Sequence, residues 1–290
     1  MDTIIGLGNA GCNIVDKFAK YSQYITYKLD VGMPMTPTTF SLERFQNIED
    51  YEEKCPDLGS LFKAATDEIL FVIGGGGRIS SAALSILKQV KNHKINVLYI
   101  KPDVSFLGQQ SLMLDNLVFN VMQEYARSGV FERLYVVDNA CIEKVIPAVS
   151  VKNYYDNLND AIVSTFHMIN VFNHIESVTD TFSDLPAGAR ISTVGFLDPK
   201  KNLDKMFFSL DSVSDIVYYY AYNKVKLETE NNLFGDIRNS LKRKMEPGVR
   251  VSYGIFETDY EEDYIYCINH TSVIQGQQKD GGSGHLPTSP

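Results

Sequence analysis

Two glycine-rich stretches have the residue types and spacing that hold phosphate groups. Gly6, Gly8 and Gly11 stand in the spacing G-x-G-x-x-G between a strand-like and a helix-like apolar run. Such glycines let the backbone approach a pyrophosphate, and the N-terminus of the following helix favours an anion. Asp30 closes the next expected strand, where the ribose-binding acid of a dinucleotide fold would lie. Alone, this stretch fits NAD binding or a tight turn without a ligand.

Four consecutive glycines (74–77) form the second stretch, directly after a strongly apolar run. Successive backbone N–H groups can surround a phosphate chain, and the hydroxyls of Ser80 and Ser81 add donors. The stretch is not a Walker A loop, because no G-K-[ST] follows. Two glycine loops from different strands suit a longer polyphosphate than a dinucleotide carries. The pair therefore favours a nucleoside triphosphate, with a ligand-free surface loop as the alternative.

A third group of residues has the chemistry to hold a purine base. Tyr155 and Asn159 lie four residues apart on an expected helix and therefore share one side. The tyrosine ring offers a stacking face, and the asparagine amide can hydrogen-bond a purine edge. Asn139, at the end of an expected strand, adds a second amide. An amphipathic helix with a polar first turn is the alternative interpretation of this spacing.

Alternating strands and helices must position these residues. Helices are expected over 10–21, 80–91 and 109–129, and strands over 3–8, 24–30, 68–75, 95–102 and 132–139. This alternation predicts an α/β fold with a Rossmann-like parallel sheet, helices on both faces and a ligand at the carboxyl ends of the strands.

The second half of the chain has a different pattern. A long helix is expected over 154–175, followed by strands over 189–198, 248–259 and 263–273 and by helical stretches near 201–223 and 233–244. This order predicts a smaller α+β domain beyond the long helix. Residues 275–290 are polar and rich in Gly, Ser and Pro, and we expect a disordered tail there.

Composition and charge exclude several classes of protein. The net charge of -9 argues against a protein that holds nucleic acid through its overall field. No apolar run reaches the roughly 18 residues of a membrane span. The four cysteines form no C-x-x-C pair, so we expect neither a zinc site nor a disulfide framework. A reducing cytoplasm fits this pattern.

The segments and their order resemble the tubulin/FtsZ family of GTPases. "GNAGCNI" (8–14) is similar to the family's first nucleotide loop, and "GGGGRISSAA" (74–83) occupies the place of the signature G-G-G-T-G-[ST]-G. "VLYIKPD", "LYVVDNACIEKV" and "YDNLNDAIVS" are similar to the Lys-Pro strand, the segment with a guanine-binding Asn and the start of the central helix. The resemblance covers most of residues 1–200 and implies a divergent prokaryotic or phage-type member.

The resemblance implies domains and ligand contacts. The domains would be a GTP-binding domain over 1–153, a central helix over 154–175, an α+β activation domain over 176–274 and the tail over 275–290. Phosphates of GTP or GDP, with Mg²⁺, would contact Gly8, Asn9, Gly11, Asn13, Gly75, Gly76, Gly77 and Ser80. Guanine would contact Asn139, Tyr155 and Asn159. No residue is assigned to a protein-held metal.

Hydrolysis in this family is completed by the next subunit, whose carboxylates orient the attacking water. The matching positions here are Asp180 and Asp184. The implied partner is therefore another copy of the chain in a head-to-tail filament, in the cytoplasm, or in the host cytoplasm if the chain is phage-encoded. A cargo or adaptor bound through the C-terminal domain or the tail would be a further partner.

The sequence departs from the family pattern in two segments that carry the family's chemistry. Arg78, Ile79 and Ser81 replace the Thr and the later glycines of the signature. The segment after the central helix, "ESVTDTFSDLP" (176–186), lacks the Asn of the catalytic pattern N-x-D-x-x-[DE]. Nucleotide binding is therefore better supported than hydrolysis. A degenerate tubulin-like structural or interaction protein without GTPase activity and an NAD-dependent Rossmann oxidoreductase remain the alternatives.

Overall fold

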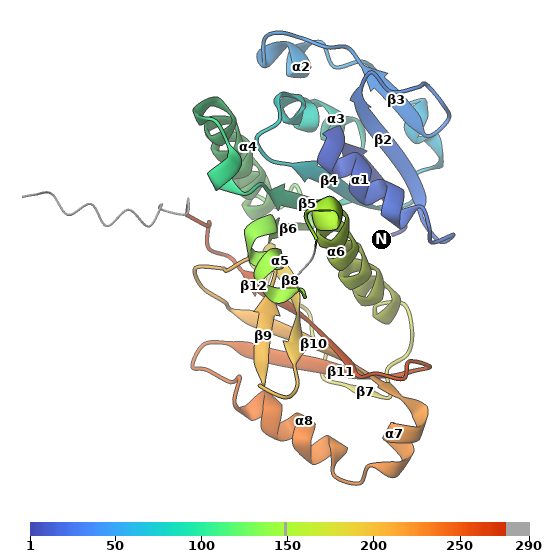
Figure 1. The fold of residues 1–290 in the computed structure, drawn as a ribbon, viewed down its shortest axis with the longest axis vertical. Helices are drawn as coiled ribbons and strands as arrows, with labels where there is room; N and C mark the ends of the chain where they lie inside the picture. The colour runs from blue at the N-terminus through green and yellow to red at the C-terminus, as the bar shows by residue number, and fades with distance from the viewer. Residues whose placement is uncertain (148–149, 277–290) are drawn as a thin grey trace, which may run out of the picture.

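The computed structural model describes residues 1–147 and 150–276 and is drawn in Figure 1. The first half of the chain forms β1 (Thr3–Leu7), α1 (Gly8–Phe18), β2 (Ile25–Val31), β3 (Thr39–Leu42), α2 (Glu49–Glu53), η1 (Leu61–Ala64), β4 (Glu68–Gly74), η2 (Arg78–Ala82), α3 (Ala83–Gln89), β5 (Lys94–Lys101), η3 (Val104–Phe106), α4 (Gln109–Arg127), β6 (Arg133–Asp138) and α5 (Asn139–Val145). The second half forms η4 (Val151–Asn153), α6 (Tyr154–Phe172), β7 (Thr179–Asp180), β8 (Ile191–Asp198), β9 (Leu203–Met206), β10 (Asp215–Asn223), α7 (Lys224–Thr229), α8 (Leu233–Lys242), β11 (Arg250–Thr258) and β12 (Tyr264–Thr271).

The strands of the first half form the expected parallel sheet. The order across the whole sheet is β3-β2-β1-β4-β5-β6-β8-β12-β10-β11-β7, with β9 paired to β8. Residues 69–73 of β4 are buried on both faces, which is typical of a central parallel strand. One core cluster lies on the side of α3 and α4, and a second lies on the side of α1 and α6. The predicted α/β fold is therefore confirmed.

Helix α6 is the predicted long helix. Leu158, Ile162, Phe166 and Ile169 recur at helical spacing and are buried against the sheet. The helix contacts α1 in the first half of the chain and β8 in the second, and Figure 1 shows it running past both parts of the sheet. It therefore links the two halves of the fold.

The prediction of a helical stretch near 201–223 is wrong, because the structure has β9 and β10 there. Tyr218 and Tyr220 pack on one face of β10, in the cluster beside α8, whereas Val217 and Tyr219 pack on the other face beside α6. Both faces are buried and apolar, so the strand carries no polar alternation that would reveal its period. The helix expected over 233–244 is present as α8.

A short junction joins the two parts of the sheet. Strand β6 pairs with β8 in parallel through only two residue pairs, Leu134 with Ile191 and Tyr135 with Ser192. Beyond it, β8, β12 and β10 pair antiparallel, as an α+β second part requires.

The fold includes the first residues of the expected tail. Gln275 is buried, its backbone N–H donates to Gln123 Oε1 at 2.7 Å, and Gln123 Nε2 donates back to its carbonyl oxygen. The rest of that tail, 277–290, lies outside the described residues.

Candidate functional site

The two glycine loops are in contact with each other. Strands β1 and β4 are parallel neighbours, so both loops leave the same edge of the sheet. A Cβ atom on Gly8 would lie 2.8 Å from Ile79 Cγ2, and one on Gly74 would lie 2.7 Å from the Cβ of Ala10. The structure thus brings the two predicted phosphate loops together at the carboxyl edge.

The N-terminus of α1 is free to accept an anion. Leu7 occupies the capping position without a side-chain hydrogen bond, and the first turn holds no acidic residue. The backbone N–H groups of that turn therefore retain their partial positive charge. Asn9 and Asn13 are exposed on the same helix. Gly11 has another function: a Cβ there would lie 2.5 Å from the carbonyl oxygen of Val72, so the glycine lets α1 approach β4.

The backbone of the second loop requires glycine at two positions. Gly76 has a φ of 77°, in the left-handed region, as Gly8 does with a φ of 70°. A Cβ on Gly75 would lie 1.8 Å from Asp115 Oδ1. At Gly77, by contrast, the nearest atom would be Ser80 Oγ at 3.6 Å. Gly77 is exposed, so its backbone lies at the surface of the loop.

A buried ionic cluster packs against the second loop at Gly75. Lys101 Nζ lies 2.9 Å from Asp115 Oδ2, and the Tyr99 hydroxyl donates to Asp115 Oδ1 at 2.8 Å. All three side chains are buried, and the Lys101 ammonium stands 4.2 Å from the centre of the Phe119 ring. Burial and the Asp115 charge raise the pKa of Tyr99 well above its usual value, so its hydroxyl stays a donor. Sequence reasoning missed this cluster, although an Asp on the apolar side of α4 was a signal for it.

The Ser80 hydroxyl holds the loop together, whereas Arg78 is exposed. The buried Ser80 hydroxyl directs its proton to the carbonyl oxygens of Gly74, at 3.1 Å, and Gly77. Arg78 Nη1 lies 3.4 Å from the carbonyl oxygen of Gln46. The two Ser80 bonds close the loop, and the phosphate contact of Ser80 stays a prediction.

The proposed base-binding residues lie at the start of α5 and α6. The Tyr155 ring is 61% exposed and meets the Tyr154 ring edge-on, with 5.0 Å between ring centres. Asn139 opens α5, which contacts α6. Within the described residues, neither Asn139 nor Asn159 uses its amide in a hydrogen bond, unlike Asn157, which donates to the carbonyl of Asn153. Both amides are thus available to a ligand.

An ion-pair bridge holds α6 against α1. Lys17 Nζ lies 2.7 Å from Asp156 Oδ1 and 2.6 Å from Asp160 Oδ1. Burial disfavours the charge of Lys17, but the hydrogen bonds to Asp156 and Asp160 outweigh it and raise the Lys17 pKa. Asp156 directly follows Tyr155, and Asp160 directly follows Asn159. The bridge therefore holds the start of α6, with both of these candidate residues, against α1.

The two candidate catalytic carboxylates lie at the other end of α6. Asp180 is in β7, paired with Gly254 of β11, and its carboxylate accepts hydrogen bonds from Ser177 Oγ at 2.5 Å and the Phe182 N–H at 3.2 Å. Asp184 is exposed. The 19 residues of α6 span about 28 Å at 1.5 Å per residue. The structure does not bring these carboxylates to the glycine loops of the same chain (Figure 1).

Asp30 is the last residue but one of β2. Its carboxylate accepts the N–H of Val31 at 2.7 Å. No group of three His, Cys, Asp or Glu side chains within the described residues could hold a metal ion.

None of the helices in residues 1–147 and 150–276 is long and apolar enough to cross a bilayer.

Comparisons with known proteins identify solved structures with a similar fold. No protein-family model and no curated protein matches the sequence. Among solved structures, the chain is similar to a GTPγS-form protofilament of TubZ from Bacillus thuringiensis serovar israelensis, with 17% identity, a TM-score of 0.72 and coverage of 93% of this chain and 86% of that one.

Two further structures have the same likeness. An empty FtsZ dimer from M. jannaschii has 12% identity and a TM-score of 0.67 over 99% of this chain and 94% of that one. A GTPγS-bound protofilament of CetZ2 from Haloferax volcanii has 16% identity and a TM-score of 0.67 over 93% and 92%. The paired glycine loops, the central helix and this likeness along nearly the whole chain lead to one conclusion: the protein has the tubulin/FtsZ fold.

Proposed function

We propose that the chain binds a guanine nucleotide, GTP or GDP, at the carboxyl edge of β1, β4 and β6. One observation carries the proposal: two glycine loops touch at the uncapped N-terminus of α1, and each contains a glycine with left-handed backbone, Gly8 and Gly76. Such an edge offers several backbone N–H groups to one phosphate chain. Solved structures of the same fold are described as GTPγS and GDP forms.

Each predicted contact has a place in this proposal. The backbones of Gly8, Gly75, Gly76 and Gly77 line the phosphate edge, and the exposed Asn9 and Asn13 extend it. Gly11 and Ser80 maintain the shape of the two loops. Tyr155, Asn139 and Asn159 face the base. Mg²⁺ bound to the phosphates would supply positive charge against the charge that develops during phosphoryl transfer.

A competition experiment tests the ligand. Purified protein is titrated with a fluorescent GTP analogue, and GTP, GDP, ATP and NAD compete for the site. We expect GTP and GDP to displace the analogue at least about tenfold more tightly than ATP, because a mismatched purine edge leaves buried groups unpaired. Equal displacement by ATP contradicts the base assignment. Failure of the analogue to bind, together with binding of NAD in a direct titration, supports the oxidoreductase alternative, which Asp30 near the end of β2 favours.

We further propose head-to-tail assembly, with hydrolysis completed by a neighbouring copy. The glycine loops and residues 180–184 lie at opposite ends of α6. A second subunit would therefore be needed to bring the carboxylates to the nucleotide. Asp184 is the better catalytic candidate, because the Asp180 carboxylate already accepts two local hydrogen bonds. Solved structures of this fold include protofilaments and two- and four-stranded filaments of TubZ. A binding domain over 1–153 and an activation domain over 176–274 fit this division of labour.

Phosphate release over a dilution series tests the trans step. Turnover per subunit is expected to rise with protein concentration in the wild type. Asp184→Ala is expected to sediment as polymer with GTP yet release phosphate slowly. Turnover that does not depend on concentration, or that is unchanged in Asp184→Ala, contradicts hydrolysis in trans by this residue.

A non-hydrolysing assembly protein is the second candidate. The replacement of the signature Thr by Arg78, which contacts Gln46, and the local bonds of Asp180 favour it. Polymer that forms with GTP and releases no phosphate at any concentration would establish this alternative.

A further inference from the structure

Helix α4 has apolar side chains on two sides, and only one side packs on the sheet. Leu114, Val118 and Met122 belong to the buried side. On the outer side, Met113 is 73% exposed and Leu117 is 61% exposed. Figure 1 shows the helix on the left flank of the molecule. A surface helix usually turns charged and polar residues outward, so the outer side of α4 differs from an ordinary surface helix.

The exposed apolar side chains of α4 form one row, which we call the α4 stripe. It consists of Met113, Leu117, Val121 and Tyr125, which follow one another at four-residue spacing and are therefore neighbours on the helix surface. Tyr125 is 38% exposed, and Val121 is half-buried. Single exposed apolar side chains are common on protein surfaces, whereas a contiguous group marks an interaction site.

The surroundings of the stripe lack charge. Between Gln109 and Gln123, Asp115 is the only charged residue of the sequence, and it is buried and paired with Lys101. The exposed polar residues in this range are uncharged amides, such as Asn120. Depletion of charge, together with enrichment in Met and aromatic residues, is the compositional mark of the centre of a protein–protein interface.

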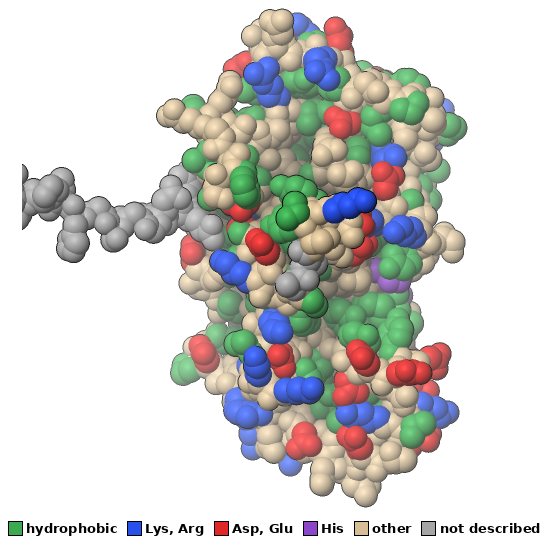
Figure 2. All heavy atoms as spheres, viewed as in Figure 1, with side chains coloured by type: hydrophobic (Ala, Val, Ile, Leu, Met, Phe, Trp, Pro, Cys, Tyr) green, Lys and Arg blue, Asp and Glu red, His purple; other side chains and the backbone are tan. Residues whose placement is uncertain are grey.

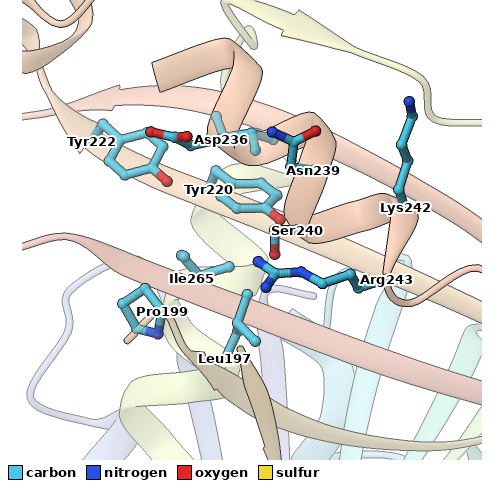
Figure 3. Close-up of a pocket in the computed structure, with 11 residues that line it drawn as sticks. Leu197, Pro199, Tyr220, Tyr222, Asp236, Asn239, Ser240, Lys242, Arg243 and Ile265 are labelled. Atoms are coloured by element: carbon cyan, nitrogen blue, oxygen red, sulfur yellow. The ribbon is translucent and has the colours of Figure 1, made fainter. Parts of the chain in front are cut away.

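Helix α8 shows what a solvated helix of the same protein carries. Figure 2 shows Lys, Arg, Asp and Glu side chains spread over the lower part of the molecule, which α7 and α8 form in Figure 1. Asp236, Lys242 and Arg243 of α8 are exposed, and Figure 3 shows Lys242 pointing away from the sheet. The contrast indicates that the outer side of α4 is suited to a partner rather than to water.

The C-terminal tail does not match the stripe. Residues 277–290 follow directly after the segment in which Gln275 bonds to Gln123 of α4, so they start beside this helix. They contain one large apolar side chain, Leu286, among glycine, proline and polar residues. One leucine cannot cover a row of four apolar side chains. The stripe of a second copy, by contrast, has an apolar row of the same length and spacing.

Two copies of the stripe fit together about a two-fold axis at Leu117. Rows of side chains at four-residue spacing are inclined to the helix axis, and two such rows interdigitate when the helices cross at about 50°. With both Leu117 side chains at the crossing point, Met113 of each copy faces Val121 of the other, because each lies four residues from Leu117. Asn116 and Asn120 flank the crossing, and their amides can donate and accept hydrogen bonds across it.

We propose that the α4 stripe pairs two copies of this chain in an isologous contact. This contact is separate from the head-to-tail contact proposed at the ends of α6, and it requires no nucleotide. The outer side of α4, about 28 Å long and roughly 10 Å wide, is smaller than the roughly 800 Å² per partner of a stable complex. Two single chains should therefore pair weakly. In a filament the contact would recur at each subunit and would join two filaments side by side.

Disulfide crosslinking of concentrated protein without nucleotide tests the pairing. Where two helices cross with axes 8–10 Å apart, facing Cα atoms lie roughly 4–5 Å from each other, within the range of a disulfide. Leu117→Cys is therefore expected to form a covalent dimer on oxidation. The wild type measures the background from the partly exposed Cys55 and Cys141.

Arg127→Cys is the matched control on the same helix. Arg127 is exposed, but it lies ten residues from Leu117, so its two copies would stand about 15 Å from the axis in opposite directions. Leu117→Cys is expected to crosslink at least about fivefold faster than this control, because disulfide formation requires close Cα atoms. Equal rates in the two variants, or no dimer of Leu117→Cys above the wild-type background, overturn the proposal.

The same two variants decide whether the tail covers the stripe. In dilute protein, Leu117→Cys and Arg127→Cys are expected to react equally fast with a small maleimide, because both positions are exposed. Slow reaction of Leu117→Cys that becomes fast after removal of residues 277–290 would show that the tail occupies the stripe, and would overturn the pairing of two copies.

A charge placed on the stripe gives a second readout. Sedimentation velocity over a dilution series, without nucleotide, measures weak self-association. Leu117→Glu is expected to associate less than the wild type, because pairing would bury an unpaired carboxylate. Leu203→Glu, at a 54% exposed leucine of β9, is the control and should associate like the wild type. Equal association of the two variants overturns the proposal, and because no nucleotide is present, this result is independent of the proposed nucleotide site.

Discussion

The two ends of α6 are built in different ways. At its N-terminal end, the glycine loops have backbone shapes that the core dictates, with Gly75 in contact with a buried ion pair and Gly76 in the left-handed region. At its C-terminal end, Asp180 and Asp184 are exposed, and β7 holds the segment through two residue pairs with β11. The glycine loops are thus fixed by packing in the core. The two carboxylates lie on a surface segment, which the Phe182 ring and the β7 pairs attach to β10 and β11.

The largest expected effect concerns the buried pair beneath the glycine loop. Lys101→Met leaves Asp115 charged and buried, and is expected to lower the free energy of unfolding by about 3–5 kcal/mol. Urea denaturation measures it. The control Lys54→Met breaks the exposed pair with Asp50 and is expected to leave the free energy of unfolding close to that of the wild type, because solvent screens exposed ion pairs. Similar losses in the two variants would contradict the difference between a fixed site and a surface.

The next effect concerns the backbone of the loop itself. Gly76→Val is expected to abolish nucleotide binding while the protein stays folded, at a stability cost of roughly 1–3 kcal/mol for its left-handed backbone. Gly248→Val is the control, because Gly248 also has a left-handed backbone, with a φ of 84°, and lies outside the glycine loops. Fluorescent GTP titration with circular dichroism measures both properties. Full affinity in folded Gly76→Val would remove the loop from the site.

A smaller effect is expected at the base side. Asn159→Ala removes an amide that no described residue uses, and is expected to weaken GTP binding about 5- to 150-fold, since one buried hydrogen bond contributes about 1–3 kcal/mol. Asn157→Ala, whose amide donates to Asn153, is the control and should bind GTP normally. The same titration measures both variants, and equal losses would point to a general effect on α6.

The smallest effect is expected at the far end of α6. Asp184→Ala is expected to change the free energy of unfolding by no more than about 0.5 kcal/mol, because the side chain is exposed. Urea denaturation of dilute, unassembled protein measures it. A loss above about 2 kcal/mol would show that the segment is held by its own chain, contrary to the comparison.

The sequence predicted the parallel half of the fold well because local signals agree there. Gly6 and Gly8 mark the end of β1, and the apolar run of β4 stops at Gly74. Strand β10 was missed because Val217 to Tyr222 are buried on both faces and show no alternation of polar residues. Local pattern alone cannot distinguish such a strand from a buried helix.

The candidate site was predictable only in part. Glycine spacing identified both phosphate loops, because their conformation is a local property. The pairing of Lys101 with Asp115 and the bond from Ser80 to Gly74 depend on how strands and helices pack, and no local pattern encodes them.

The narrow junction between β6 and β8 has a mechanical consequence. Its backbone bonds are few: the Leu134 N–H donates to Arg190 at 2.8 Å, and Phe207 bridges Asp138 and Val194. The strand pairs on either side, β4 with β5 and β8 with β12, contain more residue pairs than the β6–β8 junction. Twisting of one half of the sheet against the other should therefore concentrate at the junction, which α6 runs past. Amide protons at Leu134 and Asp138 should exchange with solvent sooner than those in the middle of β4.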